Sequence, residues 1–395
     1  MFYGLENIID SEEFISDIFN KKSILKKNFS KLHEVFNLID FDKYLITMEG
    51  NLHNVVRIIK DQKGISIPAN VDNIETQRDF VLRQFSEGAT LKLEDLDFRN
   101  TEIAKMCKTL ESIVGGEVFA KPILTGIGKK SFNIHYDMPD IFVIQLEGTK
   151  HWKVWPNHVK NPTYSMQEVL VQDNLPDPEI DILLEPGDIL YIPGGTPHIA
   201  RCVDDYSLHM SIGMIPMKIH DVLEGYIKML SQQLPILRET IYPFSSNSNL
   251  EEIKNKIIDQ LNCIPIKNMV DDYMLMQNAY KHETSEYRLK SFLLSSKINL
   301  KSKLKLKLGS NLNIRKNRDK INVYYSSTIA PIALFKINPT YIEFPEYCED
   351  AIDYLIKMEN IEFHPEDILT KLDSDSKIVL CQELLNAGIL ILVRL

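Results

Sequence analysis

Residues 131–148 read SFNIHYDMPDIFVIQLEG and hold both a predicted strand and a pair of candidate metal ligands. Residues 141–146 are apolar at nearly every position, which predicts a strand that is covered on both faces. Before this strand, His135 and Asp137 are two residues apart, and side chains at i and i+2 lie on the same face of an extended segment. One imidazole and one carboxylate can therefore converge on a single metal ion.

The third ligand is expected from residues 185–200, EPGDILYIPGGTPHIA. A turn, a short strand at residues 189–192 and a second turn at Gly194–Gly195 lead to His198. Two histidines and one carboxylate on one triangular face of an octahedron leave three positions open, as in non-haem Fe(II) oxygenases. An HxD pair alone is weak evidence, but the turn-rich approach to a lone histidine strengthens it. We therefore predict a metal site made of His135, Asp137 and His198.

The surrounding sequence, residues 118–215, consists of short apolar runs separated by Gly, Pro, Asn and Asp. This spacing is typical of an all-β sandwich or barrel. Residues 1–117 mix helical and extended patterns and form an α/β lead-in to it. The expected strands are 55–59, 141–146, 152–155, 180–184, 189–192 and 207–214, and the expected helices of the lead-in are 11–19 and 74–87.

After residue 216 the apolar period becomes helical, and two further domains are predicted. Residues 216–298 contain expected helices at 222–234, 250–261 and 266–278. Residues 299–395 end in helices at 351–357, 365–372 and 376–387 and a strand at 389–393, which is the order of a winged-helix module. In the run KLKLKL at 303–308, the leucines should face one way and the lysines the other, as in a half-buried strand.

Composition limits the class of protein. Hydrophobic residues make up 44% of the chain and charged residues 25%, the mix of a soluble globular protein. No apolar run is long enough for a membrane helix, and the first residues carry acids where a signal peptide carries bases. We therefore expect a cytoplasmic protein. An odd number of cysteines, five, without a CxxC pair argues against both a zinc ribbon and a disulfide framework.

Charge argues against a nucleic-acid-binding protein. The net charge is −10, so the surface as a whole should not attract nucleic acid. Basic residues nevertheless gather between positions 288 and 320, and such clusters can mark a face for nucleic acid or an acidic partner. We favour a solvated edge and do not expect nucleic acid as a partner.

The motifs HYDMPDIFVIQLEGTKHWKVW (135–155), PGDILYIPGGTPHIA (186–200) and SLHMSIG (207–213) together resemble the JmjC-type cupin oxygenases, in particular the ribosomal oxygenase branch. The resemblance covers nearly the whole chain. It implies an α+β protein with a JmjC cupin catalytic domain at 1–215, whose double-stranded β-helix core is 118–215, a helical dimerisation domain at 216–298 and a winged helix at 299–395. It also implies a homodimer, Fe(II) and O2 in the reaction, and 2-oxoglutarate as cosubstrate.

Carried over to this chain, the family's metal ligands are His135, Asp137 and His198. Its basic residue for the distal carboxylate of 2-oxoglutarate is Lys150, and a buried cation suits a dicarboxylate. The family has Asn and Tyr where this chain has Lys121 and Ile123. Lys121 could add a second cation for the cosubstrate or for an acidic substrate, or could point outward.

Two further residues lie in the SLHMSIG strand. Ser207 is an additional candidate for the cosubstrate pocket, and we expect His209 to be a packed histidine. The resemblance implies hydroxylation of a protein or peptide side chain, in the family that of a ribosomal protein. Two alternatives stay open. One is hydroxylation of a free or precursor peptide, or an amino acid, in natural-product biosynthesis, and the other is a non-catalytic module that binds nucleic acid or protein.

Overall fold

The computed structural model describes residues 5, 8, 12–69, 75–127, 132–166, 168, 170–240, 250–263, 265–278, 287–307, 310, 312–325, 341–358 and 361–395. The chain divides into two compact units, Met1–Pro216 and Met217–Leu395, and each is described by itself. In the described residues no helix is both long enough and apolar enough to cross a membrane.

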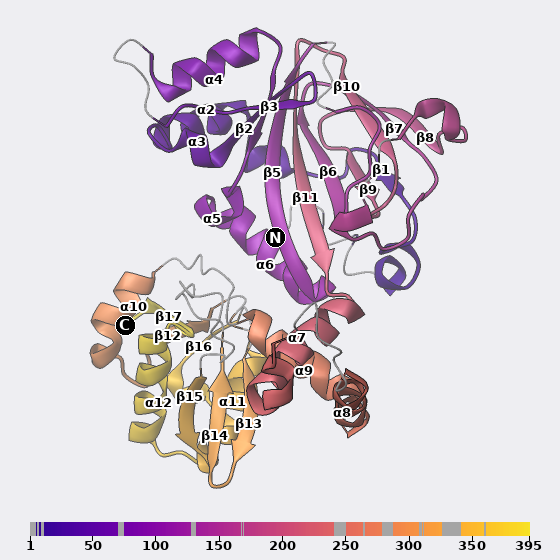
Figure 1. The fold of residues 1–395 in the computed structure, drawn as a ribbon. Coiled ribbons are helices and arrows are strands. Elements are labelled where there is room, and N and C mark those ends of the chain that lie inside the picture. The colour runs from indigo at the N-terminus through magenta and orange to yellow at the C-terminus, as the bar shows by residue number, and fades with distance from the viewer. Residues whose placement is uncertain are drawn as a thin grey trace. The chain divides into compact units, whose positions relative to one another are not determined.

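An eight-stranded antiparallel sheet is the largest element of the first unit, with the order β1-β9-β6-β11-β5-β4-β2-β3. β5 and β11 are its longest strands and lie side by side in its middle (Figure 1). The strands are β1 Ile24–Lys26, β2 Val56–Lys60, β3 Lys63–Ile65, β4 Thr90–Leu93, β5 Gly116–Gly126, β6 Asp140–Glu147, β9 Ile189–Ile192 and β11 Tyr206–Pro216.

Helices cover one face of this sheet. The helices are α2 Leu38–Thr47, α3 Leu52–Val55, α4 Gln77–Ser86, α5 Leu96–Arg99 and α6 Thr101–Val114. α6 begins at Asn100, whose side chain accepts hydrogen bonds from two backbone N–H groups of the first turn, and ends at Gly115 in the left-handed conformation. Its buried side, including Ile103 and Leu110, joins one apolar core with alternate residues of β5 such as Val118 and Ala120.

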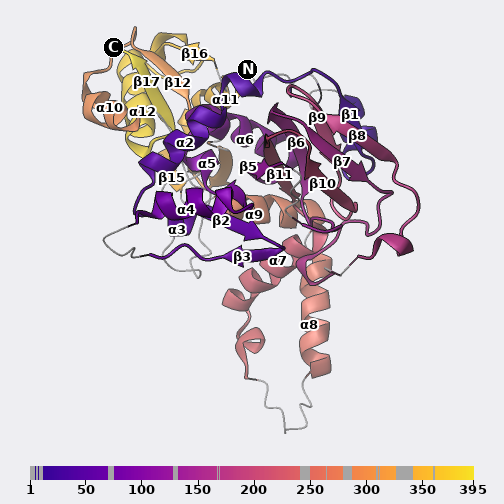
Figure 2. The same cartoon turned by 90° about the horizontal axis from the view of Figure 1, so that it is seen from above.

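A three-stranded sheet of order β10-β7-β8 lies against the other face of the large sheet (Figure 2). Its strands are β7 Lys150–Val154, β8 Ile180–Leu184 and β10 His198–Cys202. A second apolar cluster fills the space between the sheets, where Ile141 and Val143 of β6 meet Trp152 and Val154 of β7. β6 is therefore buried on both faces, as its unbroken apolar run predicts.

The predicted strands of the first unit are confirmed within a few residues by β2, β6, β7, β8, β9 and β11. The helix predicted at 74–87 corresponds to α4, although residue 74 lies outside the described residues. The helix predicted at 11–19 differs, because its centre, Phe14–Ile18, is a π-helical stretch. Phe14 at its start packs on Phe142 and Tyr191 of the large sheet, with ring centroids 5.7 Å and 5.4 Å away.

The second unit begins with helices and ends with two small sheets, β16-β12-β17 and β13-β14-β15. The predicted helices at 222–234, 250–261 and 266–278 are confirmed by α7, α8 and α9. The elements are α7 Ile219–Gln233, α8 Leu250–Cys263, α9 Ile266–Asn278, α10 Arg288–Leu294, β12 Lys303–Leu306, β13 Asn313–Asn317, β14 Lys320–Tyr324, β15 Tyr341–Pro345, α11 Glu349–Lys357, β16 Glu362–Phe363, α12 Ser374–Ala387 and β17 Leu390–Arg394.

The helix predicted at 365–372 is wrong, because only one turn, Pro365–Asp367, forms there. The Thr370 hydroxyl accepts a hydrogen bond from the Leu372 backbone, and Asp373 accepts one from Ser376 to begin α12. Such side-chain bonds to the local backbone compete with helical ones.

The alternating KLKLKL run forms β12, in which Leu304 and Leu306 are buried. Leu308 lies outside the described residues. Lys307, expected on the solvent side, is buried instead, because it follows the end of the strand and its backbone N–H bonds to Ile389.

Phe142 should contribute strongly to stability because it is fully buried and stacks on Phe14 in the core of the first unit. We expect Phe142→Ala to lower the free energy of unfolding by about 3–5 kcal/mol. Urea denaturation followed by tryptophan fluorescence measures this unit, since both tryptophans, Trp152 and Trp155, belong to it. Phe98→Ala, at a side chain that is 44% exposed, is the matched control and should cost much less. Equal losses would contradict the assigned core.

Candidate metal centre and cosubstrate pocket

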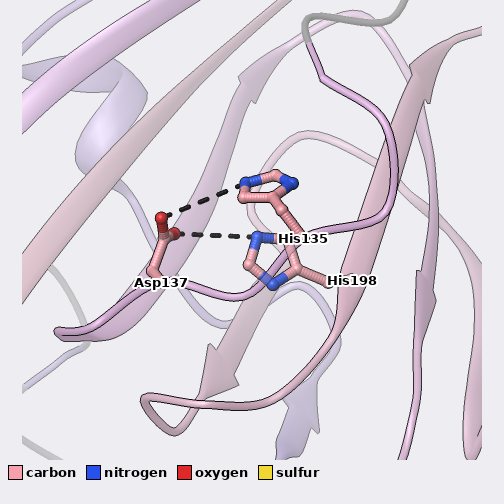
Figure 3. Close-up of side chains that lie close together, drawn as sticks. All are labelled: His135, Asp137 and His198. Carbon is pink, nitrogen blue, oxygen red and sulfur yellow. Dashed lines mark ion pairs between the residues drawn. The ribbon is translucent and has the colours of Figure 1, made fainter. Parts of the chain in front are cut away.

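The structure brings His135, Asp137 and His198 together, with their possible ligand atoms within 4.8 Å of one another. The Asp137 carboxylate faces both imidazoles from one side, 4.0 Å from Nε2 of His135 and 3.7 Å from Nε2 of His198 (Figure 3). The two rings are 4.5 Å apart between centroids. Residues 63 positions apart in the chain thus present three donors to one point, as the sequence predicts.

Hydrogen bonds to the Nδ1 atoms of both histidine rings favour metal binding through the Nε2 atoms. Nδ1 of His135 lies 2.9 Å from the Asn133 carbonyl, and Nδ1 of His198 lies 3.0 Å from the Thr196 carbonyl. A carbonyl oxygen can only accept, so both Nδ1 atoms carry the proton and both Nε2 atoms keep a free lone pair. Backbone partners of this kind fix the tautomer and orientation of metal-binding histidines.

Burial also keeps His198 in the form that binds metal. The side chain is 5% exposed, and burial, then the neighbouring His135, lower its pKa to about 4. The ring is therefore neutral at neutral pH. His135 and Asp137 are more open, with 34% and 40% of their side chains exposed, so the centre faces solvent on that side.

Backbone pairing links the two ligand segments directly. His135 and His198 form an isolated antiparallel bridge, with a hydrogen bond of 2.8 Å from the His198 N–H to the His135 carbonyl. The Gly195 N–H bonds to the Asp137 carbonyl at 2.8 Å. Gly195 has φ +79°, and a Cβ there would lie 1.7 Å from the Val159 carbonyl oxygen, so the turn requires glycine.

The Asp140 carboxylate also stabilises the turn at Gly194–Gly195. One of its carboxylate oxygens accepts from the Gly194 N–H at 2.8 Å, and the other accepts from the Tyr191 hydroxyl and the Asn20 N–H. Asp140 is 2% exposed. Sequence reasoning missed this residue, although a carboxylate that opens an otherwise apolar strand is the signal that could have found it.

Lys150 extends from β7 across the space between the sheets. Its Nζ donates to the Thr125 hydroxyl of β5 at 3.2 Å and lies 3.3 Å from Nδ1 of His209 on β11. The side chain is 2% exposed and, across the ranges that the structure describes, forms no ion pair. Burial lowers its pKa to about 7. A buried ammonium without a counter-charge is a fitting partner for a carboxylate ligand.

Ser207, Gln145 and Trp152 contribute further buried polar groups near Lys150. Ser207 is fully buried and accepts a hydrogen bond from the Gln145 side-chain amide at 2.8 Å. The Gln145 carbonyl oxygen and the Trp152 indole N–H are buried and have no hydrogen-bond partner among the described residues. The Trp152 ring stands edge-on to His209 at 5.6 Å and 5.9 Å from His198. Polar groups therefore continue from Lys150 toward the metal ligands.

The register of β5 places Lys121 on the same face as Thr125, because the two residues are four positions apart. The outward alternative for Lys121 is therefore wrong. Its Nζ is 2.7 Å from the Glu94 carboxylate and 4.4 Å from the centre of the Phe119 ring. Lys121 thus already has a carboxylate partner, unlike Lys150. Ile123 lies on this face too, opposite His209 of β11.

The structure adds residues that sequence reasoning did not single out for the pocket. Thr125 is one, and a single threonine near the end of the long strand β5 gave no signal. His209 was expected to be simply packed, yet it lies beside Lys150, and burial lowers the pKa of its ring well below the usual value. A neutral Nδ1 can accept from the ammonium, which orients Lys150.

Two packed antiparallel sheets with a histidine–aspartate–histidine cluster at one end define a cupin-type fold with a candidate two-histidine, one-carboxylate centre. Residues 95–222 match the JmjC domain family. This part of the chain is therefore similar to JmjC domains, and the similar proteins include ribosomal oxygenases.

One relative is the protein of Dictyostelium discoideum named bifunctional lysine-specific demethylase and histidyl-hydroxylase NO66. It is 28% identical over 247 residues, which are 59% of this chain and 46% of that protein. The chain spans less than half the length of the first curated relatives that it matches.

Solved structures of YcfD, a ribosomal oxygenase from Escherichia coli, have the same fold. One superposes with a TM-score of 0.58 at 15% identity, over 96% of this chain and 97% of that one. Another, in complex with cobalt and 2-oxoglutarate, gives 0.56 at 16% identity over the same shares.

The convergence of three donors predicts a single divalent-metal site. We expect His198→Ala to weaken Co(II) binding by at least about tenfold, because loss of even an outer-shell partner of a metal ligand costs about 10- to 100-fold. Titration of metal-free protein by isothermal calorimetry measures it. His151→Ala is the control, since His151 pairs with Asp181 on the outer side of β7 and should leave affinity unchanged. Undiminished Co(II) binding by the His198 variant would contradict the site.

Proposed function

We propose that this protein is an Fe(II)- and 2-oxoglutarate-dependent oxygenase that hydroxylates a protein or peptide side chain. One arrangement carries the proposal: three convergent metal donors in the same sheet pair as a buried lysine, Lys150, for which the described part of the chain supplies no counter-charge. The donor set of neutral imidazoles and one carboxylate, without thiolate, suits Fe(II). The cobalt and 2-oxoglutarate bound in YcfD, a protein of the same fold, support the same cofactors here.

Each residue has a part that follows from its surroundings. His135, Asp137 and His198 would hold the metal, which would supply the activation of O2 with 2-oxoglutarate as the co-oxidised substrate. Lys150 would bind the distal carboxylate of 2-oxoglutarate, and Thr125 and His209 would keep its ammonium in place. The Trp152 N–H, buried without a partner, would offer a further donor to an anionic ligand. The apolar cluster around Val143 and Val154 would exclude water.

The substrate class is inferred from the relatives. Their names include histidyl-hydroxylase and ribosomal oxygenase, which supports a side chain of a protein, in the first instance a ribosomal one. Asp137 and His135 are partly exposed, so the centre is open enough for a side chain carried on a larger molecule.

For the second unit we propose that α7, α8 and α9 pair two chains and that the C-terminal residues form a winged helix. Large apolar side chains are exposed on these helices, which supports pairing: Ile219, Leu223, Ile258, Ile266 and Met274. A role in nucleic-acid binding has less support. Lys303, Lys316 and Lys320 of the basic segment pair with glutamates of the same unit, which removes charge available to phosphates.

The proposed activity is tested by release of CO2 from carboxyl-labelled 2-oxoglutarate with Fe(II) and ascorbate. We expect turnover by the wild type and none above background for Asp137→Ala, because the metal loses its carboxylate ligand. The variant should keep the wild-type unfolding transition, as the side chain is 40% exposed. Wild-type-like turnover in Asp137→Ala, or none in the wild type with Fe(II) bound, would contradict the proposal. Mass spectrometry of ribosomal proteins for one added oxygen then identifies the substrate.

Cosubstrate affinity should depend on pH through Lys150. Its pKa of about 7 means that the ammonium is present below pH 7 and is lost as pH rises above it. Binding of a dianion above pH 7 must therefore take up a proton, and affinity should fall by up to about tenfold per pH unit. Calorimetry on Co(II)-saturated protein in buffers of different ionisation enthalpy measures the uptake. Lys150→Met should bind weakly and without this dependence, and an equal dependence in both proteins would exclude Lys150 as its source.

A further inference from the structure

A second cationic group lies near the metal centre and has no part in the proposed function. Glu94 follows β4 directly, and its carboxylate forms ion pairs with two lysines. Lys121 Nζ is 2.7 Å from one oxygen and Lys92 Nζ is 3.6 Å from the other. The three side chains are 25%, 27% and 17% exposed for Lys121, Lys92 and Glu94, so they are partly buried but reachable from solvent.

This cluster holds more positive than negative charge. Two ammonium groups share a single carboxylate, which leaves one unit of positive charge in a partly desolvated place. Burial lowers the pKa of Lys92, Glu94 counteracts this, and Lys121 adds to the lowering by repulsion. A second carboxylate, supplied by a ligand, would balance the charge.

The sheet register shows which face the cluster occupies. Lys92 is opposite Ile123, and Ile123 is opposite His209, so the three side chains form one row across β4, β5 and β11. Lys121 is opposite Ser211 in the next row. Since His209 contacts Lys150, both lysines lie on the inner face that carries the proposed cosubstrate pocket.

The cluster is nevertheless too far from Lys150 to bind the same carboxylate. Lys121 and Thr125 are four residues apart on an extended strand, which separates their backbones by about 13 Å. Thr125 contacts Lys150 directly, whereas Lys121 is held by Glu94 and the Phe119 ring. A carboxylate bound at Lys150 is therefore out of reach of Lys121.

The cluster lies instead toward the metal ligands. His209 ends the row that begins at Lys92, and its ring is 5.6 Å from the Trp152 ring. Trp152, two residues beyond Lys150 on β7, already contacts the His198 ring, so the metal donors follow Lys150 in the same direction. Lys92 and Lys121 therefore lie on the same side of Lys150 as the candidate metal donors.

We propose that Lys92 and Lys121, held apart by Glu94, form a subsite for a carboxylate of the substrate next to the residue that is hydroxylated. The inference rests on the proposed function for the identity of the reaction, but the binding itself does not need turnover. It narrows the substrate to an acidic peptide or protein segment. The carboxylate is either an Asp or Glu side chain or a free C-terminus, which share the same chemistry.

The test uses the full chain loaded with Co(II) and 2-oxoglutarate under argon, and fluorescein-labelled nonapeptide pools as probes. One pool is rich in Asp and Glu, a second carries Asn and Gln at the same positions, and both end in an amide. A third pool has the Asn and Gln positions and a free C-terminal carboxylate. We expect the wild type to bind a carboxylate pool about tenfold more tightly than its amide counterpart, on the scale of one charge-assisted pair. The first and third pools distinguish a side chain from a C-terminus.

Variants then assign the preference to the cluster. Lys92→Met/Lys121→Met should bind all pools alike, whereas Glu94→Gln should tighten carboxylate binding because both ammonium groups become free. A merely structural ion-pair network would not give this opposite sign. Lys153→Met is the matched control, since Lys153 pairs with Asp181 at 3.0 Å and alternates with the inward-facing Trp152 and Val154. It should keep the wild-type preference.

Equal binding of all pools by the wild type, a preference that survives in the double methionine variant, or no tightening in Glu94→Gln would each overturn the subsite. Calorimetry on the same samples separates this from the proposed function. The double variant should bind 2-oxoglutarate as the wild type does. Loss of that binding would show that the two lysines bind the cosubstrate and not the substrate. Failure of the wild type to bind 2-oxoglutarate would contradict the proposed function, while the pools still decide the subsite.

Discussion

The short antiparallel pairing between the HYD segment and the turn before His198 is the constraint on which the candidate site depends. The His135–His198 bridge and the Gly195-to-Asp137 hydrogen bond fix the three donors relative to one another through backbone atoms. Asp140 then ties the same turn to β6. Backbone bonds vary less than side-chain rotamers, so the donors are held in place before any ion binds.

The two faces of the large sheet have different roles in the first unit: one packs in the apolar core and the other carries polar and charged side chains. The face toward α6 is apolar and belongs to the largest core, which makes the sheet rigid. The inner face mixes apolar side chains with the lysines, His209 and Ser207, and its charges are only partly balanced. Alternation along β5 and β11 produces both surfaces from the same strands. Charge on the inner face is costly unless a ligand compensates it, so the imbalance itself points to anions.

Local patterns predicted well what short-range physics controls. The apolar run of β6, the helical period of α7 to α9 and the spacing in HxD all depend on neighbours within a few residues. Prediction from the sequence failed where side-chain hydrogen bonds compete with helical ones, or where residues remote in sequence determine burial. Residues 365–372 do not form the predicted helix, because the Thr370 and Asp373 side chains accept hydrogen bonds from the local backbone. Lys307 is buried although its position in the repeat favoured solvent.

The sequence by itself predicted the three candidate metal donors and the strands around them from spacing and motif, and it predicted Lys150 as a candidate cation from the family resemblance. Only the tertiary structure decided which groups surround Lys150 and that Lys121 shares Glu94 with Lys92. Those partners come from strands that are adjacent in space yet remote in sequence. Whether a lysine is a lone buried charge or half of an ion pair depends on distances that the order of residues does not contain.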